Sequence, residues 1–311
     1  MPRQIFIKKA AEGEFGKSPA ERTADELIQY GIVNIDKPTG PTSHQTSDYV
    51  KKILHLEKAG HSGTLDPAVT GVQPIALGRA TRITQFLLTA PKEYVCLMHI
   101  HQEIDEKTIR ETLSQFLGKI RQLPPLKSAV KRVERTREIY EFEILEIKGK
   151  DVLFRVKCQA GTYVRKLCFD IGKKLGVGAH MAELRRTQAG PFTEQDNLVT
   201  LNDLQDAYHF YKEENNSKLL MHCIQPIENA LRHIAKCWVL DTTLQSVSHG
   251  RDVAVPGISK LENFRKSEVV AVMTLKEELV AIGEAVMSGV EINTQQKGIT
   301  VEVKKVFMEP I

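Results

Sequence analysis

The stretch "GHSGTLDPAVTGVQPIALGRATR", residues 60–82, places a single carboxylate, Asp66, in a run of small and turn-forming residues. Gly63 and Pro67 flank this carboxylate and predict a loop, and the apolar segment 72–77 predicts a strand after it. An aspartate in a turn most often does no more than close the turn with its own side chain. Evidence from the rest of the chain is therefore needed to tell whether Asp66 takes part in catalysis.

The composition is typical of a globular protein. The chain has 311 residues, enough for two domains, with 41% hydrophobic and 26% charged residues. We find no apolar run of about 18 residues and no apolar segment typical of a signal peptide. The five cysteines contain no CxxC pair, so we expect buried thiols in a cytoplasmic protein and neither a disulfide framework nor a zinc site.

Positive charge is concentrated in residues 119–137, which hold seven Lys or Arg and one Glu. Residues 194–230 hold seven acids and two lysines, so the two segments differ strongly in charge. A basic cluster suits an RNA backbone, because each neutralised phosphate releases a counterion. A solvated basic loop is an equally good interpretation of the charge alone. Under the RNA interpretation, the contacting residues are Lys127, Lys131, Arg132, Arg135 and Arg137.

Hydrophobic periodicity and turn residues predict alternating strands and helices up to about residue 234. We expect strands at 31–36, 72–77, 92–101, 139–148 and 151–158, and helices at 43–56, 80–89, 104–118, 161–176 and within 200–234. In helix 104–118 the predicted apolar face contains Ile109, Leu113, Phe116 and Leu117. Short strands with turns follow residue 236, which predicts a domain boundary near 235.

Arg165 lies in the first turn of "GTYVRKLCFDIGKKLG", residues 161–176, the clearest amphipathic helix of the chain. A guanidinium there can pair with a carboxylate and favour its ionised form in a desolvated site. Such a pair suits an acid that acts as a nucleophile, whereas glycoside hydrolysis needs two carboxylates. The sequence by itself leaves open whether Asp66 and Arg165 touch.

Other motifs in the chain do not predict a metal site, a nucleotide-binding site or a further nucleophile. His99 and His101 share one face of a predicted strand, but no third ligand follows at a useful spacing, so we expect no metal site. The glycines match neither a Walker loop nor GxGxxG, and no Ser or Cys lies in a nucleophile elbow.

Five motifs in order give a specific resemblance. Residues 60–82, together with "GIVNIDKPTGPTSH", "KEYVCLMHIH", "AGTYVRKL" and "HMAELRRTQAGPF", resemble the TruB-type pseudouridine synthases, and the basic and closing segments resemble the archaeal dyskerin branch with its PUA domain. The resemblance implies an α+β fold. Residues 31–234 would form a catalytic domain with a central mixed, largely antiparallel sheet flanked by helices. Residues 235–311 would form a small β-barrel-like PUA domain, on which an N-terminal extension, residues 1–30, packs.

The same resemblance implies an isomerase without cofactor or metal, which detaches uracil from its ribose, rotates it and rejoins it through C5. Asp66 matches the nucleophile of the family, which attacks either the base or the sugar. Tyr94 matches the tyrosine that stacks on the target base and is a candidate for removing the C5 proton. Arg165 matches the residue that pairs with the nucleophile. To Lys37 and Pro38, in the first motif, we assign structure before chemistry.

Further residues follow from the matched motifs. His61 and Leu184 correspond to residues of the substrate pocket, and Arg185 and Arg186 are expected to contact RNA. Ala68 departs from the branch, which usually has lysine there, so one RNA contact beside the catalytic loop is in doubt.

The dyskerin-like branch implies partners as well. They are a box H/ACA guide RNA, rRNA and tRNA substrates, and three small accessory proteins, with no membrane. One alternative is a guide-independent synthase that acts on the T-loop uridine of tRNA. Another is an RNA-binding scaffold without catalysis, which would make no use of Asp66.

Overall fold

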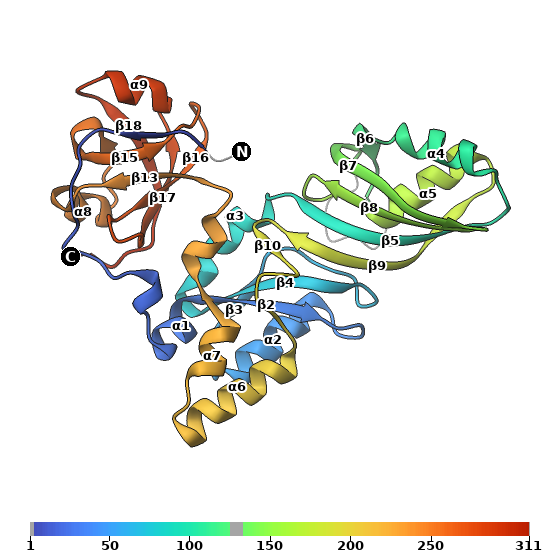
Figure 1. Ribbon diagram of the computed structural model, residues 1–311, viewed down its shortest axis with the longest axis horizontal. Coiled ribbons are helices and arrows are strands. Elements are labelled where there is room, and N and C mark those ends of the chain that lie inside the picture. The colour runs from blue at the N-terminus through green and yellow to red at the C-terminus, as the bar shows by residue number, and fades with distance from the viewer. Residues whose placement is uncertain (1–2, 125–132, 311) are drawn as a thin grey trace. The chain divides into compact units, whose positions relative to one another are not determined.

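The computed structural model describes residues 3–124 and 133–310, which form two compact units (Figure 1). The smaller unit comprises Met1–Leu27 and Pro226–Ile311, and the larger unit comprises Ile28–Gln225. None of the helices in the described ranges combines the length and the apolar character that a membrane crossing needs.

A mixed sheet of eleven strands forms the centre of the larger unit. Its main order is β11-β2-β4-β9-β5-β8-β7-β6, with β3, β10 and β12 paired to β4, β9 and β2. The pairs β11–β2 and β4–β9 are parallel, and antiparallel pairs predominate elsewhere, which confirms the predicted α+β class with its mixed sheet. The strands are β2 (Gly31–Lys37), β3 (Ala59–His61), β4 (Thr70–Leu77), β5 (Lys92–Ile100), β6 (Gly118–Gln122), β7 (Arg135–Lys148), β8 (Asp151–Cys158), β9 (Ala179–Ala189), β10 (Phe192–Thr193), β11 (Leu198–Val199) and β12 (Ile224–Pro226).

Helices flank this sheet (Figure 1). They are α2 (Ser43–Ile53), α3 (Thr84–Leu88) after the 3-10 turn η2 (Gly78–Ile83), α4 (Glu106–Ser114), α5 (Val164–Leu175), α6 (Leu201–Glu214) and α7 (Lys218–Cys223). The apolar faces of α4 and α5 share one hydrophobic core with β5, β7 and β8. Gly176 ends α5 in the left-handed conformation at φ +79°, as its place after the apolar stripe predicts.

Two helix predictions need correction. The helix expected at 80–89 is a 3-10 turn followed by the short helix α3. The helix expected at 104–118 ends at Ser114, and Leu117, placed on its apolar face, is 56% exposed. The chain turns after this helix through Gly118 at φ +87° into β6, which takes Leu117 off the helical face. The expectation for the cysteines is confirmed, since all five are free and buried.

The smaller unit is built on a seven-stranded sheet in the order β1-β15-β13-β16-β17-β18-β14. The N-terminal strand β1 pairs antiparallel with β15, so residues from the two ends of the chain share this sheet. The strands are β1 (Ile5–Ile7), β13 (Ala235–Val239), β14 (Val253–Ala254), β15 (Ile258–Glu262), β16 (Val269–Met273), β17 (Leu279–Ala285) and β18 (Ile299–Val306). The helical segments are η1 (Pro19–Glu21), α1 (Ala24–Tyr30), which runs across the unit boundary, η3 (Ile227–Leu231), α8 (Asp241–Ser248), η4 (Val255–Gly257) and α9 (Gly289–Thr294).

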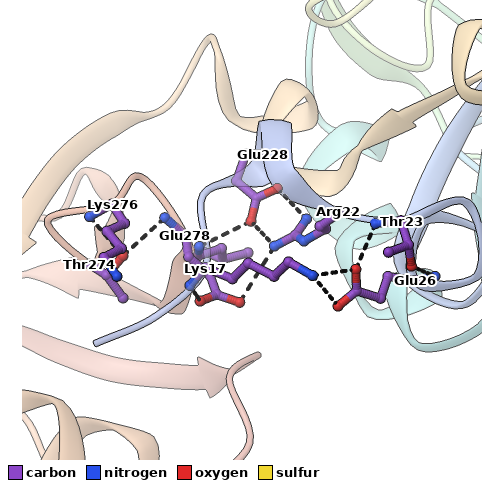
Figure 2. Close-up of polar contacts among 9 residues, drawn as sticks. Lys17, Arg22, Thr23, Glu26, Glu228, Thr274, Lys276 and Glu278 are labelled. Atoms are coloured by element: carbon purple, nitrogen blue, oxygen red, sulfur yellow. Dashed lines mark hydrogen bonds and ion pairs between the residues drawn. The ribbon is translucent and has the colours of Figure 1, made fainter. Parts of the chain in front are cut away.

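The unit boundary lies at Pro226, earlier than the boundary expected near 235. A buried ion pair explains the difference (Figure 2). Arg22 donates two hydrogen bonds of 2.7 Å to the carboxylate of Glu228, in η3, and lies 3.6 Å from the carboxylate of Glu278. Glu278 also accepts from the backbone of Lys17 at 2.7 Å. Glu228 thus ties η3 to the N-terminal residues of the same unit, and the unit boundary falls before η3.

We predict that Arg22→Met lowers the free energy of unfolding by about 3–5 kcal/mol, because it leaves a buried carboxylate without its cation. Both side chains are nearly inaccessible, at 4% and 8% exposure for Arg22 and Glu228. Lys17→Met removes the exposed pair with Glu26 and is the matched control, with an expected loss below about 1 kcal/mol. Chemical denaturation measures both, and equal losses in the two variants would contradict the prediction.

Candidate active site

The loop between β3 and β4 carries Asp66, and the buried side chain of Lys37 holds this loop. Its ammonium donates to the carbonyl oxygens of Val69 at 2.8 Å, Pro38 at 2.9 Å and Pro67 at 3.2 Å. Burial, together with the nearby Arg186, lowers the pKa of Lys37. Three carbonyl dipoles compensate for the buried charge, and two of them, from Pro67 and Val69, fix the loop backbone just after Asp66.

A second set of contacts ties the same loop to the start of α2. The backbone N–H of Leu65 donates to the Ser43 hydroxyl oxygen at 2.7 Å, and Gln73 donates to the Ser43 carbonyl at 2.9 Å. Helix α2 itself begins at a capping box formed by Thr42 and Gln45. The backbone beside Asp66 is therefore held by β2, β4 and α2 together, whereas its carboxylate is 52% exposed.

The carboxylate of Asp66 and the guanidinium of Arg165 form an ion pair. Arg165 occupies the first turn of α5, whose neighbouring residues Val164 and Leu167 are buried in the core. The structure thus brings together two residues that lie 99 positions apart in the sequence, and both side chains remain open to solvent.

Tyr94 and Leu184 lie on the adjacent strands β5 and β9. Tyr94 lies opposite Arg186 in the antiparallel ladder, and Leu184 lies opposite Cys96. Burial raises the pKa of Tyr94, and the nearby charge of Arg186 opposes the increase. Leu184 is partly buried against the core under β5 and β9.

His61 ends β3, five residues before Asp66. Burial, with smaller contributions from the charges of Arg186 and His44, lowers the pKa of His61 below its usual value. The imidazole is therefore neutral at pH 7, which suits a supporting contact better than a charged one.

The two arginines of "ELRRT" differ in the structure. Arg185 is partly exposed and makes a bidentate pair with Asp36 at 3.0 Å and a bond of 2.6 Å to Glu194. Arg186 is only 1% exposed, and its Nε donates to the Val72 carbonyl at 2.7 Å. The predicted RNA contact of Arg186 therefore has no exposed side chain to make it in this structure, whereas Arg185 is partly exposed.

The structure describes only some of the remaining residues that are expected to contact RNA. Arg135 and Arg137 lie on β7, with Arg137 packed over Gly161 next to α5. Ala68 is exposed in the turn after Asp66. The predicted contacts Lys127, Lys131 and Arg132 lie outside the described residues.

The histidines examined for metal binding pair with other groups. His99 is 2.7 Å from Asp151, and His101 is 3.0 Å from His180 on β9. Within residues 3–124 and 133–310, no group of His, Cys, Asp or Glu side chains is arranged to hold a metal ion.

A mixed-sheet unit that carries the Asp66–Arg165 pair, next in sequence to a β-rich unit, fits a class of RNA-modifying isomerases, and the profile matches identify that class. The chain matches the profile "TruB family pseudouridylate synthase (N terminal domain)" over residues 51–164 and "tRNA pseudouridylate synthase B C-terminal domain" over 165–232. It also matches the PUA domain over 235–307 and the DKCLD domain over 3–47. The chain belongs to the TruB family of pseudouridine synthases, so it is an isomerase.

Relatives span nearly the full chain. A protein named "Probable tRNA pseudouridine synthase B" from Methanothermobacter thermautotrophicus is 54% identical over 100% of this chain and 96% of its own length. The protein of the same name from Pyrococcus abyssi is also 54% identical, covering 98% of this chain and 93% of its own. Among solved structures, a chain of "Crystal Structure of a Cbf5-Nop10-Gar1 Complex" superposes with TM-score 0.95 at 51% identity, covering 100% of this chain and 95% of that chain. A chain of "Structure of H/ACA RNP bound to a substrate RNA containing 2'-deoxyuridine" superposes with TM-score 0.93 at 48% identity, covering 100% of this chain and 96% of that chain.

Proposed function

We propose that this protein converts uridine to pseudouridine in rRNA and tRNA as the catalytic subunit of a box H/ACA ribonucleoprotein. The ion pair between Asp66 and Arg165 is the observation that supports the catalytic role in this proposal. The likeness to the chain solved with Nop10 and Gar1 supports the assembly, in which a guide RNA and three small accessory proteins join the enzyme. The PUA domain at residues 235–307 would hold the guide. We also place the protein in the cytoplasm, in keeping with its five free thiols.

The reaction breaks the bond between N1 of uracil and C1′ of ribose and forms a bond between C5 and C1′. C5 loses its proton and N1 gains one, so atoms and electrons balance without an oxidant. Asp66 acts as the nucleophile on the base or the sugar, and the ion pair with Arg165 orients its carboxylate. Extruding the base costs a few kcal/mol. Stacking on the ring of Tyr94 returns about 1–3 kcal/mol. His61 and Leu184 contribute to the same pocket.

A guide-independent activity on the T-loop uridine of tRNA is the second candidate. The names of the relatives from Methanothermobacter and Pyrococcus favour it, since both are described as tRNA pseudouridine synthase B. The two functions share one active site and differ in what presents the uridine.

Tritium release from C5-labelled uridine separates these candidates. The substrates are a tRNA transcript and an RNA matched to a guide, each with and without guide and accessory proteins. Release only from the guide-matched RNA supports the guided particle, and release from tRNA by the bare protein supports the second candidate. No release from either RNA would contradict both and would leave an RNA-binding scaffold.

We predict that Arg135→Gln together with Arg137→Gln weakens RNA binding and flattens its salt dependence. The slope of log K against log salt should fall by about one unit per lost phosphate contact. Titrations at several salt concentrations measure the slope. Arg110→Gln removes an arginine of α4 that pairs with Glu106 and is the control. An unchanged slope in the β7 variant would mean that these arginines form a solvated face.

A further inference from the structure

Arg185 reaches across strand β4 at the residue where the loop that carries Asp66 ends. The sheet order is β2-β4-β9, so β4 separates Arg185, on β9, from Asp36, on β2 (Figure 1). The guanidinium nevertheless donates two hydrogen bonds of 3.0 Å to the Asp36 carboxylate, one from each terminal nitrogen. Its Nη1 also donates to the hydroxyl oxygen of Thr70, the first residue of β4, at 3.4 Å. One side chain therefore joins three strands at the point where the Asp66 loop enters the sheet.

A second carboxylate holds the same guanidinium. The Nε of Arg185 donates to Glu194, just after β10, at 2.6 Å, so these bonds use four of the five N–H donors of the guanidinium. One positive and two negative charges give the group of Asp36, Arg185 and Glu194 a net charge of −1. An RNA phosphate that approached Arg185 would also meet two carboxylates, which repel it. The arrangement suits a fixed side chain better than a phosphate contact.

The opposite face of the sheet is braced at the same place. Lys37 follows Asp36 on β2, so its side chain lies on the other face. It donates to the carbonyl oxygen of Val69 at 2.8 Å, and Val69 directly precedes Thr70. The last residues of the Asp66 loop are thus held by Lys37 from one face and by Arg185 from the other.

We infer that Arg185 is a positioning residue, which ties the end of the Asp66 loop to β2 and so sets where the Asp66 carboxylate meets the target uridine. The inference rests on the proposed function, because it explains how the nucleophile of that reaction is aimed. The N–H of Val69 donates to the carbonyl oxygen of Asp66 at 3.0 Å, which closes the turn between Asp66 and Thr70. A shift at the start of β4 therefore moves Asp66, and a misplacement of about 1 Å can cost about 100-fold in rate. Arg185 acts through Asp66 and need not touch the RNA.

The surroundings of this ion pair allow substitutions that should fold. A cavity of about 400 Å³ borders Asp36, Thr70, Arg185 and the first residues of α6. The side chains of Arg185 and Asp36 are 37% and 30% exposed. Replacing Arg185 therefore neither overfills a packed core nor leaves a buried carboxylate without its cation.

Single-turnover tritium release from the RNA that the wild type modifies tests the inference. Arg185→Met should lower the rate constant by about 10- to 100-fold, because the loop loses its link to β2. The Kd for the same RNA and the slope of its salt dependence should not change, since no phosphate contact is lost. Arg185→Lys keeps the charge but lacks the planar fork of donors, so it should restore only part of the rate.

A double-mutant cycle with Asp36→Asn isolates the link across β4. Asp36→Asn and Arg185→Met break the same link, so the double variant should be no slower than the slower single variant. Glu194→Gln weakens the bond that does not cross β4 and should have a smaller effect than Asp36→Asn. Arg155→Met removes an exposed arginine of β8 that pairs with Glu143, in the same sheet, and should leave the rate unchanged.

Chemical denaturation shows which variants are folded under the conditions of the assay. If Arg185→Met does not fold, Arg185→Lys takes its place in the cycle. The wild-type rate in a folded Arg185→Met, or additive effects in the cycle, would overturn the inference while the function stands. A weaker Kd with a smaller salt slope would mean that Arg185 binds a phosphate, which would overturn it as well. Absence of release by the wild type would overturn the proposed function and the inference with it.

Discussion

Asp66→Asn is expected to lower tritium release by at least about 10⁴-fold, because the amide is no nucleophile and the reaction has no second acid to replace it. Lys37 and Ser43 hold the loop through its backbone, so the substitution leaves the loop in place. RNA affinity should not fall, since a carboxylate makes no favourable contact with a phosphate. Single-turnover release and equilibrium binding to the same RNA measure the two properties separately.

Asp48→Asn is the matched control for this experiment. Asp48 lies on α2 and pairs with Lys51 and Lys52, and these partners lower its pKa to about 2. It is a charged aspartate away from the candidate site, so its loss should leave turnover unchanged. A parallel loss of RNA binding in Asp66→Asn, or residual turnover near that of the wild type, would count against Asp66 as the nucleophile.

Gly71→Ala is expected to destabilise the protein by more than about 4 kcal/mol or to prevent folding. Gly71 has φ +103°, and the new Cβ would lie 2.2 Å from the carbonyl oxygen of Arg186. Backbone cannot yield as a flexible side chain can, so β4 and β9 would have to separate. Chemical denaturation gives the loss, and the yield of folded protein gives the lower limit if unfolding cannot be measured.

Gly40→Ala separates the clash from the backbone strain. Gly40 has φ +110°, close to that of Gly71, but a Cβ atom there would meet nothing within 4 Å. Its expected cost is only the strain of a left-handed alanine, about 1–2 kcal/mol. Equal losses at Gly71 and Gly40 would show that the close approach of β4 to β9 contributes nothing beyond strain.

Local sequence patterns were sufficient to predict much of the secondary structure. The apolar run of β4, the alternation of β8 and the stripe of α5 each identify their element, since burial imposes its period on the residues. The same reasoning placed Asp66 in a loop and Arg165 in the first turn of α5. It failed at 80–89, where only tertiary context distinguishes a 3-10 turn from an α-helix, and at β1, a strand of three residues whose partner lies at the other end of the chain.

Adjacent arginines on a strand must point to opposite faces, so the sequence already separates Arg185 from Arg186. Only the position of β9 between β4 and β5 decides that Arg186 is the buried one and that it lies opposite Tyr94. The contact of Asp66 with Arg165, over 99 residues, is likewise tertiary. Residue types and local periods are properties of short segments, whereas the faces that become buried, and the distant groups that meet, depend on how the strands pair.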